Sequence, residues 1–398
     1  MPRIAKKYEQ LALDDDYLSD SLLMTLAWKK SHQYIRTANW YADNFELDLS
    51  ALSLLENARQ WCEELQQDEL TFKPLELVPA PKQHSWEFKK PDSGSDECLE
   101  WQPSNQPLDE YNQKSEQEKK EINKPADLAF SLRPLAHMPI REQSMMTLLM
   151  MCIANQVETR QGDPNTDLEL VHDKKVVSYG NRLYCRYDEQ DKADHSYGGT
   201  TTYSKFFVDN RKFLERPFHF AQKARNELDE GHEVFIIELD FAKFFDLVNR
   251  KKLCELIKNV ATAEAEPSGE FKHCDKLLAA FESWEWSEQA NIEFSKVCKN
   301  GHVTSAPKGI PQGLVAGGFL ANVYMLEFDE NLRELIGKKL QSTSCRNDVE
   351  VTLVDYCRYV DDMRLVVSAT SKSSSSPVSK YDVKELVIEV IKKLREQS

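Results

Sequence analysis

The sequence predicts an α+β protein in which helices precede, and then cover, an antiparallel sheet. Apolar side chains recur at helical spacing through residues 11–70. Residues 234–239 form a short and almost continuous apolar run, broken by Glu238, which is the pattern of a strand. Apolar and aromatic residues flank Asp361 and Asp362 on both sides. We therefore expect this pair to form the tight turn of a β-hairpin.

Length and composition indicate two or three domains with a substantial hydrophobic core. The chain has 398 residues, of which 41% are hydrophobic and 10% aromatic. No apolar run approaches the length that spans a bilayer, and no apolar segment follows the basic residues at the amino terminus. The nine cysteines include no Cys-x-x-Cys pair, which argues against a disulfide framework and a zinc ribbon. We expect a cytoplasmic protein with reduced thiols.

The net charge of -15 bears on possible partners. A protein that grips nucleic acid usually shows a basic surface. An acidic balance therefore argues against tight non-specific binding to nucleic acid, but it leaves room for local basic grooves.

Composition divides the chain into four expected regions. Residues 1–88 should form a helical amino-terminal region. Within it, one helical face carries seven apolar or aromatic side chains, namely Leu49, Leu52, Leu55, Ala58, Trp61, Cys62 and Leu65. Residues 89–124 are rich in Asp, Glu, Lys, Gln, Ser and Pro, which predicts a polar linker or insertion. Residues 125–230 and 231–398 should form two further ordered regions.

The third region begins with a basic segment. Residues 128–140 predict a pair of short strands, and a helix is expected to follow them; a second helix is expected over residues 204–228. Arg133 and Arg141 flank the short strands. They could be solvated surface groups. They could equally hold a phosphate, because a planar guanidinium donates two parallel hydrogen bonds to an oxyanion.

Three aspartates form the candidate metal site. Asp361 and Asp362 are adjacent, and partial burial would raise the pKa of one of them unless a cation lay between them. Mg²⁺ fits this role, since it binds through one or two carboxylates plus substrate phosphates. Asp240 ends the apolar run of residues 234–239 and supplies the third carboxylate that a two-metal site needs. The alternative is an acidic surface turn.

A loop and a final helix complete the prediction. Residues 309–313 read Gly-Ile-Pro-Gln-Gly, a loop whose backbone could approach a ligand closely before a helix begins. Gln312 would then lie at the junction of loop and helix; an ordinary helix start is the open alternative. Residues 381–394 predict an amphipathic helix that packs its apolar face inward.

These motifs, in this order, resemble the palm motifs of reverse transcriptases. The resemblance rests on Asp240 with an aromatic residue, Phe245, five positions later, on Pro-Gln-Gly at 311–313, and on Tyr-Val-Asp-Asp at 359–362. Upstream, Arg133-Pro134-Leu135, Arg141 and the Ser-Tyr-Gly-Asn-Arg at 178–182 are similar to the fingers motifs of the retron and group II intron enzymes. Residues 154–159 and 313–322 are similar to the defence-associated bacterial group. The resemblance covers the chain from about residue 125 to its end.

The resemblance implies a right-hand polymerase, with fingers over residues 125–230 and a palm, a split βαβ antiparallel sheet, over residues 231–398. It implies an RNA-directed DNA polymerase of antiphage defence that uses an RNA template, a DNA or RNA primer and dNTPs. Two Mg²⁺ ions would be held by Asp240, Asp361 and Asp362. The backbone of Phe241 would touch the triphosphate, Gln312 and Gly313 would position the nucleotide, and Arg133 and Arg141 would contact phosphates. Phe245 would exclude a ribose 2′ hydroxyl.

Departures from the family pattern shape the alternatives. Gly317-Gly318 replaces the Ser-Pro of group II intron enzymes, and Val360 replaces the usual Ala, so intron mobility is not expected. Ser398 falls within the helix that follows the hairpin, so we expect a downstream domain or a partner chain to supply the thumb. Template-independent DNA synthesis and a catalytically limited RNA-binding scaffold remain alternatives. An RNA-dependent RNA polymerase is disfavoured, because such enzymes typically have a polar residue in place of Phe245.

Overall fold

A computed structural model describes residues 8, 11–38, 43–81, 86–89, 100–103, 132–227, 231–262, 271–297, 306–341, 349–371 and 378–397. Helices and strands are mixed along the chain, and every strand pairing within the described sheets is antiparallel. The expected α+β class is therefore confirmed. Within the described residues, no helix is both long enough and apolar enough to span a membrane.

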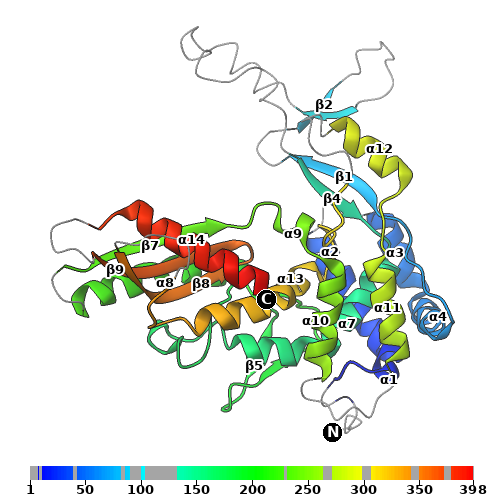
Figure 1. The fold of residues 1–398 in the computed structure, drawn as a ribbon. Helices are drawn as coiled ribbons and strands as arrows, with labels where there is room; N and C mark the ends of the chain where they lie inside the picture. Colours follow the sequence, from blue (N-terminus) through cyan, green and yellow to red (C-terminus); the bar gives the residue numbers. More distant parts are fainter. Residues whose placement is uncertain are drawn as a thin grey trace.

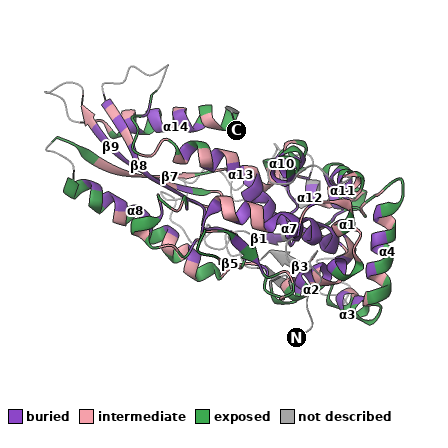
Figure 2. Ribbon diagram, turned by 90° about the horizontal axis from the view of Figure 1, so that it is seen from below, coloured by how far each residue is buried: buried purple, intermediate pink, exposed green. Residues whose placement is uncertain are grey.

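A three-stranded sheet forms the centre of the carboxyl-terminal half. Its strands are β7 (Glu233–Asp240), β8 (Val349–Tyr359) and β9 (Asp362–Ser371), in the order β7-β9-β8. Helix α8 (Phe206–Glu227) lies against one face, and α13 (Gly317–Arg333) and α14 (Lys380–Gln397) lie against the other (Figure 2). The predicted helices at 204–228 and 381–394 correspond to α8 and α14. Val383, Leu386 and Val387 of α14 are buried, as its periodicity predicted.

Strand β7 differs from the prediction in one respect. It extends one residue beyond the predicted run at each end, it lies at the edge of the sheet, and all of its residues are half-buried or exposed. Its apolar run suggested a buried strand. Helix α8 covers one face of β7, and one edge of the strand has no neighbouring strand in the described sheet. An apolar run in the sequence does not distinguish such an edge strand from a central one.

Helix α7 (Ile140–Gln161) is the core of the other half of the molecule (Figure 2). Around it pack short α1 (Asp15–Leu18), α2 (Ser21–Ala38), α3 (Asn44–Leu52), α4 (Leu54–Gln66), α10 (Arg250–Thr262) and α11 (Lys272–Glu282). The α2 side chain Ser31 donates a hydrogen bond to Thr147 of α7 over 2.8 Å. The helical character predicted for residues 11–70 is therefore confirmed for α1 to α4, and these helices share a core with α7.

The predicted apolar face of residues 49–65 is only half correct. Ala58, Trp61, Cys62 and Leu65 are buried, whereas Leu49, Leu52 and Leu55 are exposed. A break at Ser53, which has non-helical backbone angles, separates Leu49 and Leu52 of α3 from the buried residues of α4. Leu55 lies in the first turn of α4 and is exposed as well, so the buried part of the stripe begins at Ala58.

Two antiparallel strand pairs lie at the top of Figure 1. Strand β1 (Glu76–Pro81) pairs with β4 (Leu132–His137), and β2 (Trp86–Lys89) pairs with β3 (Glu100–Pro103). A small third pair joins β5 (Cys185–Tyr187) to β6 (Ala193–His195). Strand β1 lies next to α12 (Glu288–Val297).

Two sequence expectations change accordingly. The expected polar linker at 89–124 lies largely outside the described residues, but its residues 100–103 form β3 rather than unstructured chain. The expected pair of strands at 128–140 is one described strand, β4, whose partner β1 comes from residues 76–81 instead. Short α9 (Phe244–Leu247) follows β7 and leads into α10. Asn249 caps α10, since its Oδ1 accepts a hydrogen bond from the backbone N–H of Lys252.

Candidate active site

The turn between β8 and β9 carries the two adjacent aspartates. Strand β8 ends at Tyr359 and β9 begins at Asp362, so the predicted hairpin turn is confirmed. Val360, between them, has φ +58°, a left-handed conformation that is costly for a β-branched residue. Such strain persists only where the surroundings determine the geometry.

Two contacts hold this turn. A guanidinium N–H of Arg358 donates a hydrogen bond to the Val360 carbonyl over 2.7 Å. On the other side, Gly180 approaches so closely that a Cβ built there would lie 2.5 Å from the Val360 nitrogen. The absence of a side chain at position 180 therefore allows the loop of residues 178–182 to press against the turn.

Arg358 links the turn to helix α13. It is fully buried, and its Nε and Nη2 atoms donate to the carboxylate of Asp329 at 2.6 to 3.1 Å. Nη2 also lies 3.2 Å from Ser178 Oγ and 3.2 Å from Asn322 Oδ1. A buried guanidinium with all of these partners fixes the hairpin against both α13 and the 178–182 loop.

Strand pairing brings Asp240 to the same place. In the β7–β9 register, Asp240 is the direct partner of Asp362. The next residue, Phe241, donates its backbone N–H to the carbonyl of Asp361 over 3.3 Å. Three carboxylates from two separate segments of the chain therefore meet at one end of the sheet.

Electrostatics at this end favour a cation. Burial raises the pKa of Asp361 above its ordinary value, and repulsion from Asp240 and Asp362 adds to the effect, while Arg133 opposes it. Burial and Asp240 likewise raise the pKa of Asp362, against the opposing effect of Arg364. A divalent cation would relieve this repulsion, and three carboxylates are the hard oxygen donors that Mg²⁺ prefers.

The donor set therefore fits a divalent ion. Within the described part of the chain, however, no three acidic, histidine or cysteine side chains are gathered closely enough to enclose one. Binding would require the carboxylates of Asp240, Asp361 and Asp362 to turn toward a shared ion. Asp240 and Asp362 are exposed, so their side chains have room to rotate.

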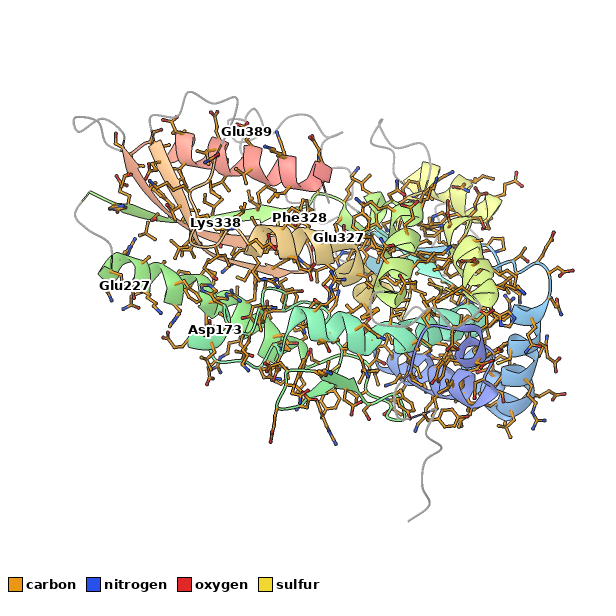
Figure 3. The ribbon with its side chains drawn as sticks, turned by 60° about the horizontal axis from the view of Figure 1, so that its bottom comes forward. Asp173, Glu227, Glu327, Phe328, Lys338 and Glu389 are labelled. Atoms are coloured by element: carbon orange, nitrogen blue, oxygen red, sulfur yellow. The ribbon has the colours of Figure 1, made fainter. Side chains whose placement is uncertain are left out.

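An aromatic cavity adjoins Asp240. It has a volume of about 610 Å³ and is lined by Asp240, Phe241, Tyr324, Phe328 and Arg395, among others. Figure 3 labels Phe328 on α13. The Phe241 and Phe328 rings meet edge to face at 5.9 Å. The packing of Phe241 against this wall fixes the backbone that follows Asp240.

Gln312 and Phe245 lie around a second, smaller cavity of about 190 Å³. The Gln312 side-chain amide donates to Asp246 Oδ1 over 2.9 Å, and the Gln312 carbonyl accepts from the backbone N–H of Ala136 in β4. The backbone N–H of Ile310 donates to the Phe245 carbonyl over 2.8 Å. Gly309 makes this approach possible, since a Cβ there would overlap the Phe245 carbonyl oxygen. Gly313 also lines the cavity.

The comparisons with known proteins identify the carboxyl-terminal half of the chain. Residues 203–398 match the family described as reverse transcriptase (RNA-dependent DNA polymerase). The chain carries a reverse transcriptase domain. The match confirms the resemblance that the motifs at 240, 311–313 and 359–362 indicated. A domain of this family is an enzyme domain of the nucleotidyltransferase class. Reverse transcriptases generally use divalent metal ions, in agreement with the donor set.

Protein YkfC of Escherichia coli K12 is also similar to this chain. The two are 27% identical over 181 residues, which cover 39% of this chain and 41% of YkfC. The chain thus matches about two fifths of the length of this curated relative.

Of the two predicted arginines, Arg133 lies near the carboxylates and Arg141 does not. Arg133 of β4 is exposed and close enough to lower the pKa of Asp361. Arg141, in contrast, forms ion pairs with Glu64 at 2.6 Å and with Glu142 at 2.7 Å, and its Nη1 also donates to the Thr71 carbonyl. These contacts tie α7 to the amino-terminal helices, so Arg141 is not presented to the carboxylates. The sequence pattern could not reveal partners that lie so far away along the chain.

Sequence reasoning gave no role in the site to four residues that the structure places around it. Tyr34, Asn181 and Tyr203 line the smaller cavity with Phe245 and Gln312, and Arg358 holds the turn. Asn181 lies within the 178–182 motif, and Arg358 had a local signal, since a charged residue between apolar and aromatic neighbours must find a buried partner. For Tyr34, an aromatic residue at helical spacing favoured core packing over base stacking.

Proposed function

We propose that this chain is an RNA-directed DNA polymerase that adds dNTPs to a primer 3′ hydroxyl with the help of two Mg²⁺ ions. The observation that carries the proposal is the β7–β9 register, which sets Asp240 opposite Asp362 and beside Asp361. Three carboxylates at one end of a sheet, in a reverse transcriptase domain, match the requirement of two-metal nucleotidyl transfer.

The proposed roles of the residues follow from their positions. Asp240, Asp361 and Asp362 would hold the ions, which when bound lower the pKa of the attacking hydroxyl and neutralise the triphosphate. The backbone of Phe241 would bind the triphosphate and Arg133 would contact a phosphate. Gln312, fixed by its hydrogen bond to Asp246, and Gly313 would position the nucleoside in the smaller cavity. Phe245, which lines the same cavity, would exclude a 2′ hydroxyl.

Nucleotide incorporation tests the proposal. Purified protein is incubated with Mg²⁺, labelled dNTPs and a primed RNA template, and any product is sequenced. We expect a DNA copy of the template, and Asp361→Asn should reduce the rate by about 1,000-fold or more, since that carboxylate serves the chemical step. Asp173→Asn is the matched control, because Asp173 is exposed and lies elsewhere on the molecule (Figure 3). Equal incorporation by the Asp361→Asn variant would contradict the catalytic assignment.

The sequence of the product separates the alternatives. A product unrelated to the template would indicate template-independent synthesis, and RNA binding without any product would indicate a scaffold. We also propose a role in antiphage defence, on the resemblance of residues 154–159 and 313–322. Phage plating on bacteria that express the wild-type protein or the Asp361→Asn variant tests this role. If the variant protects as well as the wild type, defence does not depend on DNA synthesis. A thumb supplied by downstream sequence or by a partner chain stays a prediction.

A further inference from the structure

The smaller cavity has a wall that comes from outside the reverse transcriptase domain. Its lining includes Phe245, Gln312 and Gly313, which the proposed function assigns to the incoming nucleotide, together with Asn181 and Tyr203. Tyr34 of α2 completes the lining. The amino-terminal helices, which the sequence treats as a separate region, therefore reach the proposed nucleotide site.

Tyr34 is held firmly at this position. Its ring lies 5.5 Å from that of Tyr203, inclined by 59°. Tyr203 is itself anchored, since its hydroxyl donates to the Val315 carbonyl at 2.6 Å and accepts from the Phe319 backbone N–H at 3.2 Å. One turn earlier in α2, the Ser31 hydroxyl forms hydrogen bonds with the Gln143 carbonyl and the Thr147 hydroxyl of α7. A ring with this support costs little conformational entropy when a ligand packs on it.

Tyr34 also has an unused polar group. The ring is half-buried and burial raises the pKa of its hydroxyl, so it is a neutral phenol at physiological pH. Among the described residues, no group forms a hydrogen bond with this hydroxyl. Tyr203, its neighbour, uses its hydroxyl twice. The Tyr34 hydroxyl is therefore available to water or to a ligand in the cavity.

We propose that Tyr34 is a specificity-determining residue that packs against the nucleoside part of the incoming dNTP, opposite the residues of the reverse transcriptase domain. A planar ring can stack on a base or cover a deoxyribose without distinguishing one base from another. Because the cavity has a volume of only about 190 Å³, the volume of the side chain at position 34 affects how a nucleoside fits. This inference rests on the polymerase function proposed above. It makes the amino-terminal helices part of the active site.

Substitutions at Tyr34 test the inference through the split between KM and kcat. Tyr34→Leu should raise KM for dTTP and dGTP by about 5- to 100-fold, the usual effect of removing an aromatic stacking partner, and should change kcat by less than about 3-fold. Tyr34→Phe retains the ring and should stay within about 3-fold of the wild type in KM. Tyr381→Leu is the control, because Tyr381 is an exposed tyrosine of α14 outside the cavity.

Larger side chains give an independent test if Tyr34→Leu unfolds. Tyr34→Trp should overfill the cavity and raise KM for dGTP more than for dTTP. Equal KM values for wild type, Tyr34→Leu and Tyr34→Trp would overturn the inference. So would a KM that rises equally in the Tyr381→Leu control.

A binding measurement separates this inference from the proposed function. A non-hydrolysable dTTP analogue is titrated into each variant in the presence of Mg²⁺ and primed template, with no need for turnover. If the wild type binds the analogue and Tyr34→Leu binds it more weakly, the inference stands even where no DNA is made. If both bind it equally while the wild type makes DNA, the inference fails and the proposed function survives.

Discussion

Asp240 and Asp362 are direct cross-strand partners at the end of β7 and β9. Like charges in this position repel, and nothing in ordinary sheet packing favours two carboxylates there. Repulsion and burial raise the pKa of Asp362. This end of the sheet is therefore less stable without a cation than with one, which is the arrangement expected of a site whose ligand completes it.

The first prediction concerns the repulsion between the carboxylates of Asp240 and Asp362. With EDTA, Asp362→Asn should raise Tm by about 1–2 °C at pH 8. In the folded protein the pKa of Asp362 lies above its ordinary value of 3.8. The ionised carboxylate therefore destabilises the fold fully above the folded-state pKa and not at all below about 3.8. The gain should therefore vanish as pH falls through that window. Thermal melts at several pH values measure it, with Asp173→Asn as control.

With Mg²⁺ present, the order of the two Tm values should reverse, because only the wild type retains all three carboxylates. A Tm that Mg²⁺ leaves unchanged in the wild type would count against a metal at this site.

The second prediction concerns sugar choice. Phe245→Val should raise the efficiency of rNTP use relative to dNTP use by about 10-fold or more, since a smaller side chain makes room for a 2′ hydroxyl. The measurement is the ratio of kcat/KM for UTP and dTTP. Phe218→Val, at an exposed phenylalanine of α8, is the control. An unchanged ratio would make Phe245 an ordinary packing residue.

The third prediction concerns Gly180. A Cβ at this position would lie 2.5 Å from the Val360 nitrogen, so Gly180→Ala should displace the turn that carries Asp361. We expect incorporation to fall by about 10-fold or more, mainly in kcat, while the protein remains folded. Gly198→Ala is a matched control, because a Cβ there meets no atom within 4 Å. Equal activity of the two variants would show that the turn tolerates the shift.

The fourth prediction concerns Arg358. The double variant Arg358→Met/Asp329→Leu replaces a buried ion pair with apolar side chains, a change that often costs little stability. It also removes the hydrogen bond to the Val360 carbonyl. The buried Tyr356 hydroxyl also loses Asp329 as its hydrogen-bond partner, so we expect Tm to fall by about 5–10 °C. We expect kcat to fall by about 10- to 100-fold, with KM less affected.

The control for Arg358 is a pair outside the turn. Arg160→Met/Glu330→Leu removes an ion pair of 2.6 Å between α7 and α13 and should leave kcat near that of the wild type. If both double variants lose kcat equally, Arg358 has no special role in positioning the turn.

Local patterns predicted the turn, strand and loop that carry the candidate site better than the contacts around them. The Asp361–Asp362 turn, the strand that ends in Asp240 and the loop before α13 each follow from a few adjacent residues, because turn and strand preferences act over short distances. The pairing of Asp240 with Asp362 needed the resemblance, since strand order is a property of the whole fold.

Long-range contacts could not be predicted from local patterns. The ion pair of Arg141 with Glu64 joins two helices far apart in the sequence, and a contact of Arg141 with phosphate stays a prediction. The apolar stripe of residues 49–65 is broken at Ser53, which has non-helical angles, and its buried part begins at Ala58. Tyr34 lies in a helix whose pattern is satisfied by core packing, so nothing local shows that its ring borders a cavity.

The smaller cavity also sets the order in which a newly synthesised chain can acquire its function. Residues as distant as Tyr34 and Gly318 line it. At ribosomal speeds of about 5–20 residues per second, the amino-terminal helices would wait roughly 15–60 s for the start of α13 to be made, and longer for the catalytic turn. An unfinished chain that stops short of α13 thus lacks part of the proposed nucleotide site.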